Sequence, residues 1–280
     1  MRVAVIQMNS TQSVEANLAQ ARELLEQAKR DQAELAVLPE NFACYGSVNP
    51  KAIALAEVSG GPITGFLANA SKELDMWIVA GTVPLLSHNS HELDQSHGNP
   101  SDLSTLPYAA CTLWSPQGRC VTQYNQCHLF DVDVADAVGS YRESDSYKCG
   151  NETQEVSLNH YRLGLSVCYD LRFPEFFRKM AGVDVIALPS AFTHATGKAH
   201  WEVLIRARAI ENQCYMLAAN QVGEHSPGRF TWGQSAIVDP WGDIIAEVTA
   251  SAPGTAVADL NLDYIKALRA KMPCLQHRKF

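Results

Sequence analysis

Short apolar runs alternate with amphipathic segments along most of the chain. The runs have the length and composition of β-strands. They cover residues 3–8, 35–38, 76–81, 109–115, 163–168, 183–189, 215–220 and 235–238. Between the first two runs, residues 13–30 place Leu18, Ala21, Leu25 and Ala28 at intervals of three or four, which predicts a helix that packs on a sheet. This repeated strand-then-helix pattern predicts a layered α/β fold.

One segment breaks the alternation. Residues 84–107 are polar, rich in Ser, Asn and His, and without apolar periodicity, so we expect a surface loop. Its histidines, His88, His91 and His97, lie on no predicted strand or helix, and no carboxylate pattern completes a metal site around them. We therefore expect solvated histidines and no metal. With no internal repeat and no long linker, residues 1–280 are expected to form a single domain.

Composition and charge narrow the class of protein. The 280 residues are 46% hydrophobic and carry a formal net charge of −8, which would repel a phosphate backbone, so we expect no nucleic-acid partner. No apolar run approaches the roughly 20 residues that span a bilayer, and no signal segment precedes the first strand, so we expect a cytoplasmic protein without membrane contact. Eight cysteines without paired spacing are expected to be reduced and mostly structural.

The run at residues 35–38 delivers Glu40 at its carboxyl end, in the segment LAVLPENFACYG. In α/β proteins, reactive groups gather at such strand ends. Leu38 and Phe42 flank this carboxylate, and enclosure by apolar neighbours raises a carboxyl pKa into the range of a general base. The alternative is that Glu40 caps a helix or is solvated.

The segment LGLSVCYDLRFPE places Cys168 at the end of another buried-type strand, ahead of the turn that contains Pro174. A thiol at a strand-to-helix turn is well positioned for nucleophilic attack. A cysteine taken at random is more often a small buried apolar residue. Its position therefore distinguishes Cys168 from the other seven cysteines.

Three segments together indicate a family. PENF around Glu40, YNQCHLFD at 124–131 and VCYDLRFPE around Cys168 resemble, in order and spacing, the signature segments of the nitrilase superfamily of carbon–nitrogen hydrolases. The resemblance continues through AHWEVLIRARAIENQCYMLAANQ and SAIVDPWGDIIAE to MPCLQHRKF. It is greatest to the amidase branch that hydrolyses deaminated glutathione, followed by the ω-amidase branch.

The resemblance implies a four-layer αββα sandwich, assembly into a homodimer or higher homo-oligomer, and a Glu–Lys–Cys triad that hydrolyses a small amide without cofactor or metal. By their positions in the motifs, Glu40 corresponds to the general base and Cys168 to the nucleophile. Glu143 corresponds to a second glutamate that supports the substrate and the lysine. The backbone N–H of Tyr169 corresponds to one oxyanion donor, a role suited to the residue after a nucleophile.

Three further residues are candidate substrate contacts because their segments approach the pocket in the family. These are Arg172, His200 and Trp201. For Arg172 the alternative is a simple ion pair with Glu175 or Asp170.

The chain departs from the family at Gln126. In the motif Y-x-K-x-H-L the third residue is the catalytic lysine, and here Gln126 occupies that position, between Tyr124 and His128. Glutamine can donate a neutral N–H but gives no positive charge to a thiolate or an oxyanion. Lys148, the next lysine, lies outside the motif. Three explanations remain open: a substitution that traps substrate, a pseudoenzyme that acts as a binding or assembly partner, and an active enzyme with its charge elsewhere.

Overall fold

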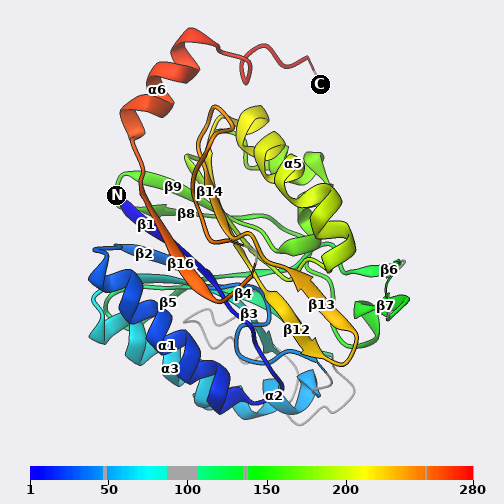
Figure 1. Ribbon diagram of the computed structural model, residues 1–280. Coiled ribbons are helices and arrows are strands. Elements are labelled where there is room, and N and C mark those ends of the chain that lie inside the picture. Colours follow the sequence, from blue (N-terminus) through cyan, green and yellow to red (C-terminus); the bar gives the residue numbers. More distant parts are fainter. Residues whose placement is uncertain (47–48, 87–105, 135, 137, 250, 280) are drawn as a thin grey trace, which may run out of the picture.

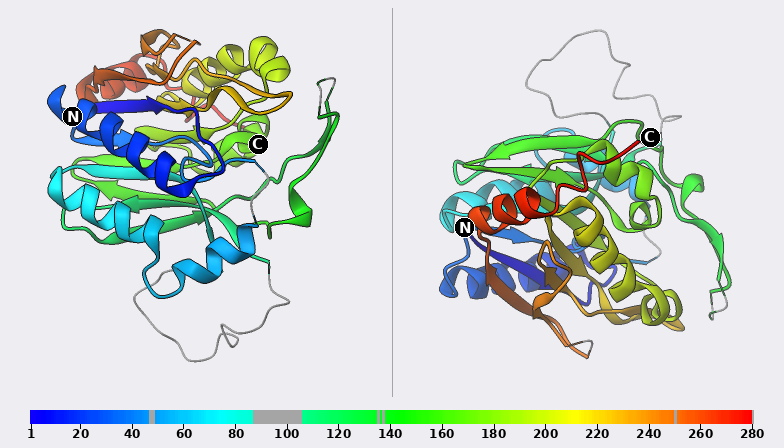
Figure 2. Two further views of the ribbon diagram at one scale, coloured as in Figure 1. Left: turned by 60° about the horizontal axis from the view of Figure 1, so that its bottom comes forward. Right: turned by 90° about the horizontal axis from the view of Figure 1, so that it is seen from above.

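A computed structural model describes residues 1–280 apart from 47–48, 87–105, 135, 137, 250 and 280. The predicted loop histidines His88, His91 and His97 therefore lie outside the described residues. Two six-stranded sheets lie face to face, and helices cover the outer side of each (Figure 1, Figure 2). The predicted αββα sandwich is confirmed.

The first sheet has the strand order β16-β1-β2-β3-β4-β5. Its strands are β1 (Arg2–Gln7), β2 (Leu35–Val37), β3 (Trp77–Leu85), β4 (Tyr108–Trp114), β5 (Cys120–Asn125) and β16 (Gly254–Asp259). Strands β1, β2 and β3 run parallel, and the outer pairs are antiparallel. The carboxyl ends of the parallel strands therefore meet at one edge, which is where Glu40 follows β2.

The second sheet has the order β15-β14-β11-β10-β9-β8 and the same parallel centre, β9, β10 and β11. Its strands are β8 (Gln154–Leu158), β9 (Tyr161–Leu165), β10 (Val185–Ser190), β11 (Tyr215–Asn220), β14 (Ala236–Val238) and β15 (Ile244–Glu247). Two hairpins complete the described strands: β6 (Asp131–Asp133) with β7 (Ser140–Arg142), and β12 (Val222–Ser226) with β13 (Arg229–Trp232).

The helices begin where the sequence has helix-starting residues. They are α1 (Val14–Arg30), α2 (Pro50–Glu57), α3 (Pro62–Glu73), α4 (Pro174–Lys179), α5 (His194–Asn212) and α6 (Leu262–Lys271), with two 3₁₀ turns, η1 (Glu143–Asp145) and η2 (Cys168–Arg172). Ser13 caps α1 by accepting the N–H of Ala16 at 3.3 Å. Proline opens α2, α3 and α4, where its missing N–H costs no hydrogen bond. None of the helices in the described ranges is long and apolar enough to cross a bilayer.

The apolar runs are continuous because both faces of the central strands are buried. In β1, Val3 and Val5 belong to the core between the two sheets, whereas Ala4 and Ile6 belong to the core beneath the helices α1 and α3. Alternate side chains of a strand point to opposite faces, so a strand between two cores must be apolar at every position.

Several predicted strand boundaries differ from the structure. The strand predicted over 163–168 ends at Leu165, and Cys168 begins the 3₁₀ turn η2 instead. The strand predicted over 76–81 continues to Leu85, into the segment predicted as a loop. Within α5 the Arg208 side chain is buried and donates to the carbonyl of Leu171 at 2.8 and 3.0 Å, so it holds η2 in place.

Candidate active site

Glu40 lies just beyond β2 and is fixed by its main chain. Its carbonyl accepts a hydrogen bond from Gln221 Nε2 at 2.9 Å, and the same nitrogen donates to Ser10 Oγ at 2.8 Å. Gln221 directly follows β11, so this network connects the ends of strands from both sheets. The Glu40 side chain is only 6% exposed, which excludes the solvated role that the sequence left open.

Gly81 allows β3 to approach this segment. A Cβ atom at position 81 would lie 1.7 Å from the Pro39 carbonyl oxygen and 2.9 Å from the Glu40 nitrogen. Only glycine avoids this overlap with neighbouring backbone. The position of Glu40 therefore depends on the absence of a side chain at residue 81 on the adjacent strand β3.

Cys168 has a left-handed backbone conformation, with φ at +39°. A residue with a Cβ atom rarely adopts this conformation, and in folded proteins it concentrates at functional sites where the surroundings hold it. Here the Asp170 carboxylate accepts the N–H of Val167 at 2.8 Å and so closes the turn that presents the thiol. The sequence located Cys168 at the turn but gave no sign of this backbone conformation.

Asp170 connects this turn to the motif around Gln126. Its buried carboxylate accepts hydrogen bonds from Tyr124 Oη at 2.7 Å and from the His128 backbone N–H at 3.2 Å. It also contacts His128 Nδ1 at 2.7 Å. These partners satisfy a buried carboxylate that would otherwise be strongly unfavourable. This role of Asp170 was not predicted from the sequence, although an acidic residue two positions after a nucleophile is a signal for it.

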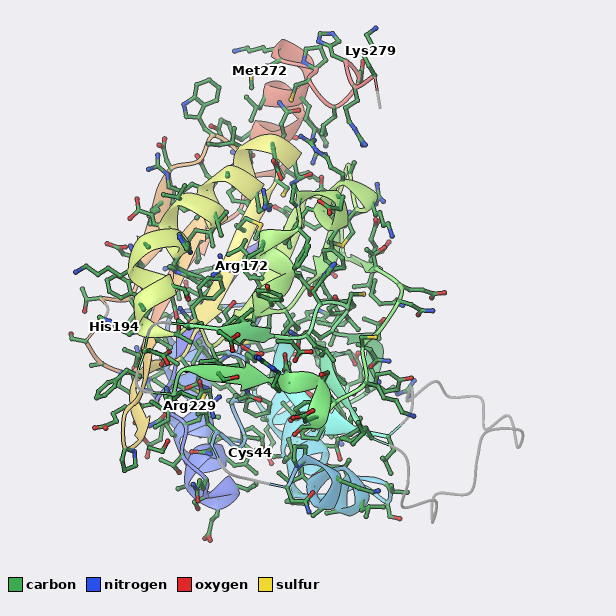
Figure 3. The ribbon with its side chains drawn as sticks, turned by 90° about the vertical axis from the view of Figure 1, so that its right-hand side faces the viewer. Cys44, Arg172, His194, Arg229, Met272 and Lys279 are labelled. Atoms are coloured by element: carbon green, nitrogen blue, oxygen red, sulfur yellow. The ribbon has the colours of Figure 1, made fainter. Side chains whose placement is uncertain are left out.

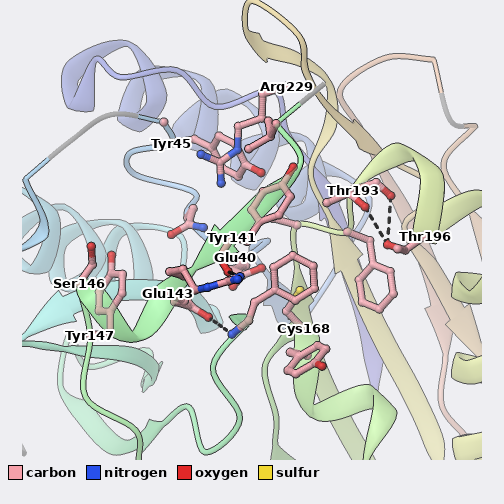
Figure 4. Close-up of a pocket in the computed structure, with 18 of the residues that line it drawn as sticks. Glu40, Tyr45, Tyr141, Glu143, Ser146, Tyr147, Cys168, Thr193, Thr196 and Arg229 are labelled. Atoms are coloured by element: carbon pink, nitrogen blue, oxygen red, sulfur yellow. Dashed lines mark hydrogen bonds between the residues drawn. The ribbon is translucent and has the colours of Figure 1, made fainter. Parts of the chain in front are cut away.

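The end of β2, the turn η2 and the hairpin β6–β7 enclose a cavity of about 320 Å³ (Figure 4). Five of the predicted site residues line it: Glu40, Glu143, Cys168, Tyr169 and Arg172. Gln126, His200 and Trp201 are not among the lining residues. The sequence did not predict the remaining aromatic and cationic residues of the wall, which include Tyr45, Tyr141, Phe192 and Arg229.

The two glutamates and the thiol strongly affect one another. Burial and the nearby Glu143 raise the pKa of Glu40 to about 8, although hydrogen bonds from the Cys168 thiol and the Ala191 N–H oppose the rise. Burial raises the pKa of Glu143 to about 7, opposed by the Phe130 N–H, which donates to Glu143 Oε2 at 2.7 Å. Burial, followed by the charge of Glu40, raises the pKa of the Cys168 thiol well above its usual range.

Gln126 adds no charge to this group. Its side chain is fully buried, its Nε2 donates to the His128 carbonyl at 2.9 Å, and its Oε1 has no hydrogen-bond partner in the described ranges. Its backbone is also fixed, because its N–H donates to the Ala109 carbonyl at 3.1 Å and its carbonyl accepts from Gly150 at 2.7 Å. The position that would carry a cation in the motif therefore holds a neutral amide with one unpaired oxygen.

Comparisons with known proteins agree with this geometry. Residues 2–270 match the carbon-nitrogen hydrolase family. The chain belongs to the carbon-nitrogen hydrolase family. It is 40% identical to the deaminated glutathione amidase of Synechocystis sp., covering 99% of this chain and 97% of that protein, and 36% identical to the human protein of the same name, covering 99% and 82%.

Solved structures of the nitrilase superfamily have the same fold. The NitFhit protein of C. elegans is 35% identical with a TM-score of 0.85; 99% of this chain aligns with it but spans only 65% of that longer chain. Nit3 of Saccharomyces cerevisiae is 26% identical with a TM-score of 0.84, covering 100% of this chain and 97% of Nit3. The resemblance of the three sequence motifs to the superfamily is therefore confirmed over nearly the whole chain.

Within this carbon-nitrogen hydrolase, the three remaining candidates have different positions. Arg172 lines the cavity, contacts the rings of Tyr169 and Phe192, and forms no ion pair within the described ranges, so pairing with Glu175 or Asp170 is not observed. His200 is exposed, and its Nδ1 lies 3.2 Å from Arg172 Nη1.

Trp201 belongs to α5 and is fully buried. Its ring packs against Phe192, with 4.9 Å between the ring centroids, and its Nε1 donates to the Gln234 carbonyl at 2.8 Å. Trp201 therefore supports Phe192, which is itself part of the cavity wall. Direct contact of Trp201 with a substrate stays a prediction.

Proposed function

We propose that this carbon-nitrogen hydrolase is a thiol-dependent amidase that acts on a small amide such as deaminated glutathione. The observation that carries the proposal is Cys168, held in a left-handed conformation at the cavity wall and hydrogen-bonded to Glu40. A nucleophile paired with a base in an enclosed pocket is the arrangement that acyl transfer requires. The names of the relatives support the choice of amide.

In the proposed reaction, Glu40 accepts the proton of the Cys168 thiol and the thiolate attacks the amide carbonyl carbon. The tetrahedral intermediate collapses, the C–N bond breaks, and the leaving nitrogen takes the proton from Glu40. Water then attacks the thioester while Glu40 accepts its proton, and that proton returns to the sulfur as the acid product leaves. The Tyr169 N–H faces the developing oxyanion in this scheme.

The cavity suits a small substrate with an anionic end. Its volume of about 320 Å³ is at the lower end of small-molecule sites. The Arg172 guanidinium lines it without a carboxylate partner in the described part of the chain, so it is available to a substrate carboxylate. Glu143, which lines the same cavity, supports the amide end.

Turnover should be slow because Gln126 replaces the lysine. Loss of one oxyanion donor costs about 2.7–4 kcal/mol, roughly a hundred- to thousand-fold in rate. The lost charge adds to this cost, because the thiol remains protonated at neutral pH.

A second candidate function is that of a catalytically silent or substrate-trapping protein that binds a ligand or partner. The raised pKa of the Cys168 thiol, together with the neutral Gln126, favours this alternative. Both proposals use the same binding cavity, so they differ only in whether a bound amide reacts with Cys168.

Ammonia release and intact mass distinguish the two. The chain is incubated with deaminated glutathione, α-ketoglutaramate and simple aliphatic amides, with Cys168→Ala as the control. Ammonia above the Cys168→Ala level, or an acyl adduct on Cys168, supports the amidase. Ligand binding with neither product nor adduct supports the silent protein, and no binding of any amide refutes both.

A further inference from the structure

Glu40 and Glu143 share a cavity that has no lysine at the motif position, so the base of the proposed amidase needs another cation to favour its ionised form. This inference rests on the proposed amidase function, in which Glu40 accepts the Cys168 proton. Among the described residues, the groups that interact electrostatically with Glu40 include Glu143, Cys168, Tyr45, Tyr147 and Arg229. Arg229 is the cation in this group.

Arg229 lines the same cavity as the two glutamates and the thiol (Figure 4). It is the first residue of β13, and its guanidinium carbon lies 4.7 Å from the ring centroid of Tyr45 and 5.6 Å from that of Tyr141. Among the described residues no carboxylate lies within ion-pair distance of it, and its buried Nε has no hydrogen-bond partner. Within the described part of the chain, its positive charge is therefore not neutralised by a contacting carboxylate.

The hairpin that carries Arg229 is anchored to the first sheet. His225 on β12 contacts the Ser10 carbonyl through Nδ1 and Thr231 Oγ1 through Nε2, both at 2.7 Å. Its ring packs against that of Tyr45 in a tilted arrangement, with 4.0 Å between the centroids. Burial lowers the pKa of His225 to about 4, so this imidazole is neutral at pH 7 and adds no second charge. The residues that hold Arg229 at the cavity therefore add no second positive charge beside it.

The other two arginines of the wall have different surroundings. Arg142 forms an exposed ion pair with Asp133 at 2.9 Å. Arg172 lies over Tyr169 and Phe192 beside His200. Figure 3 shows Arg172 and Arg229 on one face of the molecule. The attraction of Arg229 lowers the pKa of both Glu40 and Glu143 against the larger effect of burial.

We propose that Arg229 is the positioning residue that supplies the site's positive charge in place of a lysine at position 126. It favours the carboxylate form of Glu40, which then accepts the proton of Cys168. In this step the S–H bond breaks, the proton moves to a Glu40 oxygen, and a thiolate beside a neutral carboxylic acid results. The net charge of the pair is unchanged, so no other reactant is needed.

The test measures thiolate formation without any amide. Iodoacetamide alkylation of the full chain is followed from pH 6 to 10 by peptide mass spectrometry, which resolves Cys168 from the exposed Cys149. Arg229→Met should move the rise in Cys168 alkylation upward by about one pH unit, or tenfold in rate at a given pH. Arg229→Lys should retain most of the original rate, and Cys149 should label equally in every variant.

Arg142→Met is the matched control, since it removes a guanidinium from the same wall and should leave the Cys168 profile within about threefold. If Arg229→Met leaves the profile unchanged, or if Arg229→Lys falls as far as Arg229→Met at equal melting temperature, the proposal is overturned. A raised KM with an unchanged profile would instead make Arg229 a substrate anchor. If Arg229→Met does not fold, Arg229→Gln is compared with Arg229→Lys in the same way.

The outcome is separate from that of the amidase proposal. A shifted alkylation profile with no ammonia from any amide would refute the amidase while keeping the role of Arg229. Ammonia release with an unshifted alkylation profile would support the amidase and overturn the role of Arg229.

Discussion

Tyr124 Oη donates a 2.7 Å hydrogen bond to the Asp170 carboxylate and accepts the Cys127 N–H at 3.0 Å. This pair connects the end of β5, where Gln126 follows, to the turn that carries Cys168. The two motifs are 42 to 46 residues apart in the chain. Their relative position depends on one buried phenol and one buried carboxylate.

Tyr124→Phe should therefore destabilise the protein although it removes a single oxygen. The Asp170 carboxylate loses one of its donors, a hydrogen bond to a charged group that is worth about 1.5–3 kcal/mol, and the half-buried Cys127 N–H loses this partner at a cost of about 1–3 kcal/mol. We expect the melting temperature to fall by at least about 4 °C in calorimetry. Tyr264→Phe, at a more exposed position, is the control and should change it by less than about 2 °C. Equal effects would contradict the role of the pair.

Gln126→Lys should raise amide turnover by at least about a hundred-fold. An ammonium group at this position would lower the pKa of the Cys168 thiol and meet the developing oxyanion. Ammonia release from deaminated glutathione is the measurement, with Gln126→Met as an uncharged control of similar length. If the lysine and methionine variants turn over equally while both remain folded, position 126 is not where the charge is missing.

The stability of the fold should decrease between pH 6.5 and pH 8. Glu40, with a pKa raised from 4.5 to about 8, and Glu143, raised to about 7, hold protons in the folded state that the unfolded chain has already released. Because the folded state then binds more protons, the free energy of unfolding falls as pH rises. Below pH 6.5 the lowered pKa of His225, about 4, acts in the opposite direction.

Glu40→Gln tests this directly by removing the titrating group. At pH 8 it should raise the free energy of unfolding by at least about 1 kcal/mol, or a melting temperature increase of about 2–4 °C. The gain should shrink as the pH falls toward 4.5. Glu23→Gln, at an exposed position, is the control. A constant difference at every pH would mean that Glu40 is ionised at neutral pH in the folded protein.

Gly81→Ala and Gly65→Ala should have opposite effects. At position 81 the new methyl group would overlap the Pro39 carbonyl, so we expect a loss of more than about 3 kcal/mol or failure to fold. At position 65, inside α3, it would meet nothing within 4 Å, and alanine should stabilise the helix by about 0.5–1 kcal/mol. Urea unfolding of both variants is the measurement. A tolerated Gly81→Ala would show that β3 and Glu40 are less tightly fitted.

We expect a homo-oligomer that buries the outer face of α5. Val203 and Ile210 are 68% and 44% exposed one heptad apart on this helix. The turn that carries Trp241, 56% exposed, packs against the same helix, where Gly242 lies next to Ile210 and its carbonyl accepts from Arg206 Nε at 2.7 Å. Sedimentation at micromolar concentration should show a dimer or larger species, and Val203→Glu should dissociate it. Val121→Glu, on β5, is the control. A monomeric unmodified chain would contradict the expectation.

The sequence predicted those parts of the molecule that depend on local pattern. Continuous apolar runs located β1, β2, β10 and β11, and the apolar stripe located α1. It could not locate β16, because GTAVAD is weakly apolar and becomes a strand by pairing with β1 about 250 residues away. Tertiary pairing decides such a strand, not its own propensity.

The same distinction holds for the site. Glu40 and Cys168 were identifiable because each ends an apolar run and belongs to a motif. Arg229 was not, because it follows a Pro-Gly turn in a polar hairpin that reads as a loop. Its position beside the glutamates depends on the buried contacts of His225 with Ser10, which sequence spacing does not contain.

The left-handed conformation of Cys168 also bears on how this protein would respond to selection for stability. Glycine adopts that conformation without strain, so at this position the most stable residue and the only reactive one are different. Laboratory evolution toward heat resistance alone would therefore favour glycine at position 168 and discard the thiol. A laboratory selection for stability must therefore also select for the reactivity of the thiol at position 168.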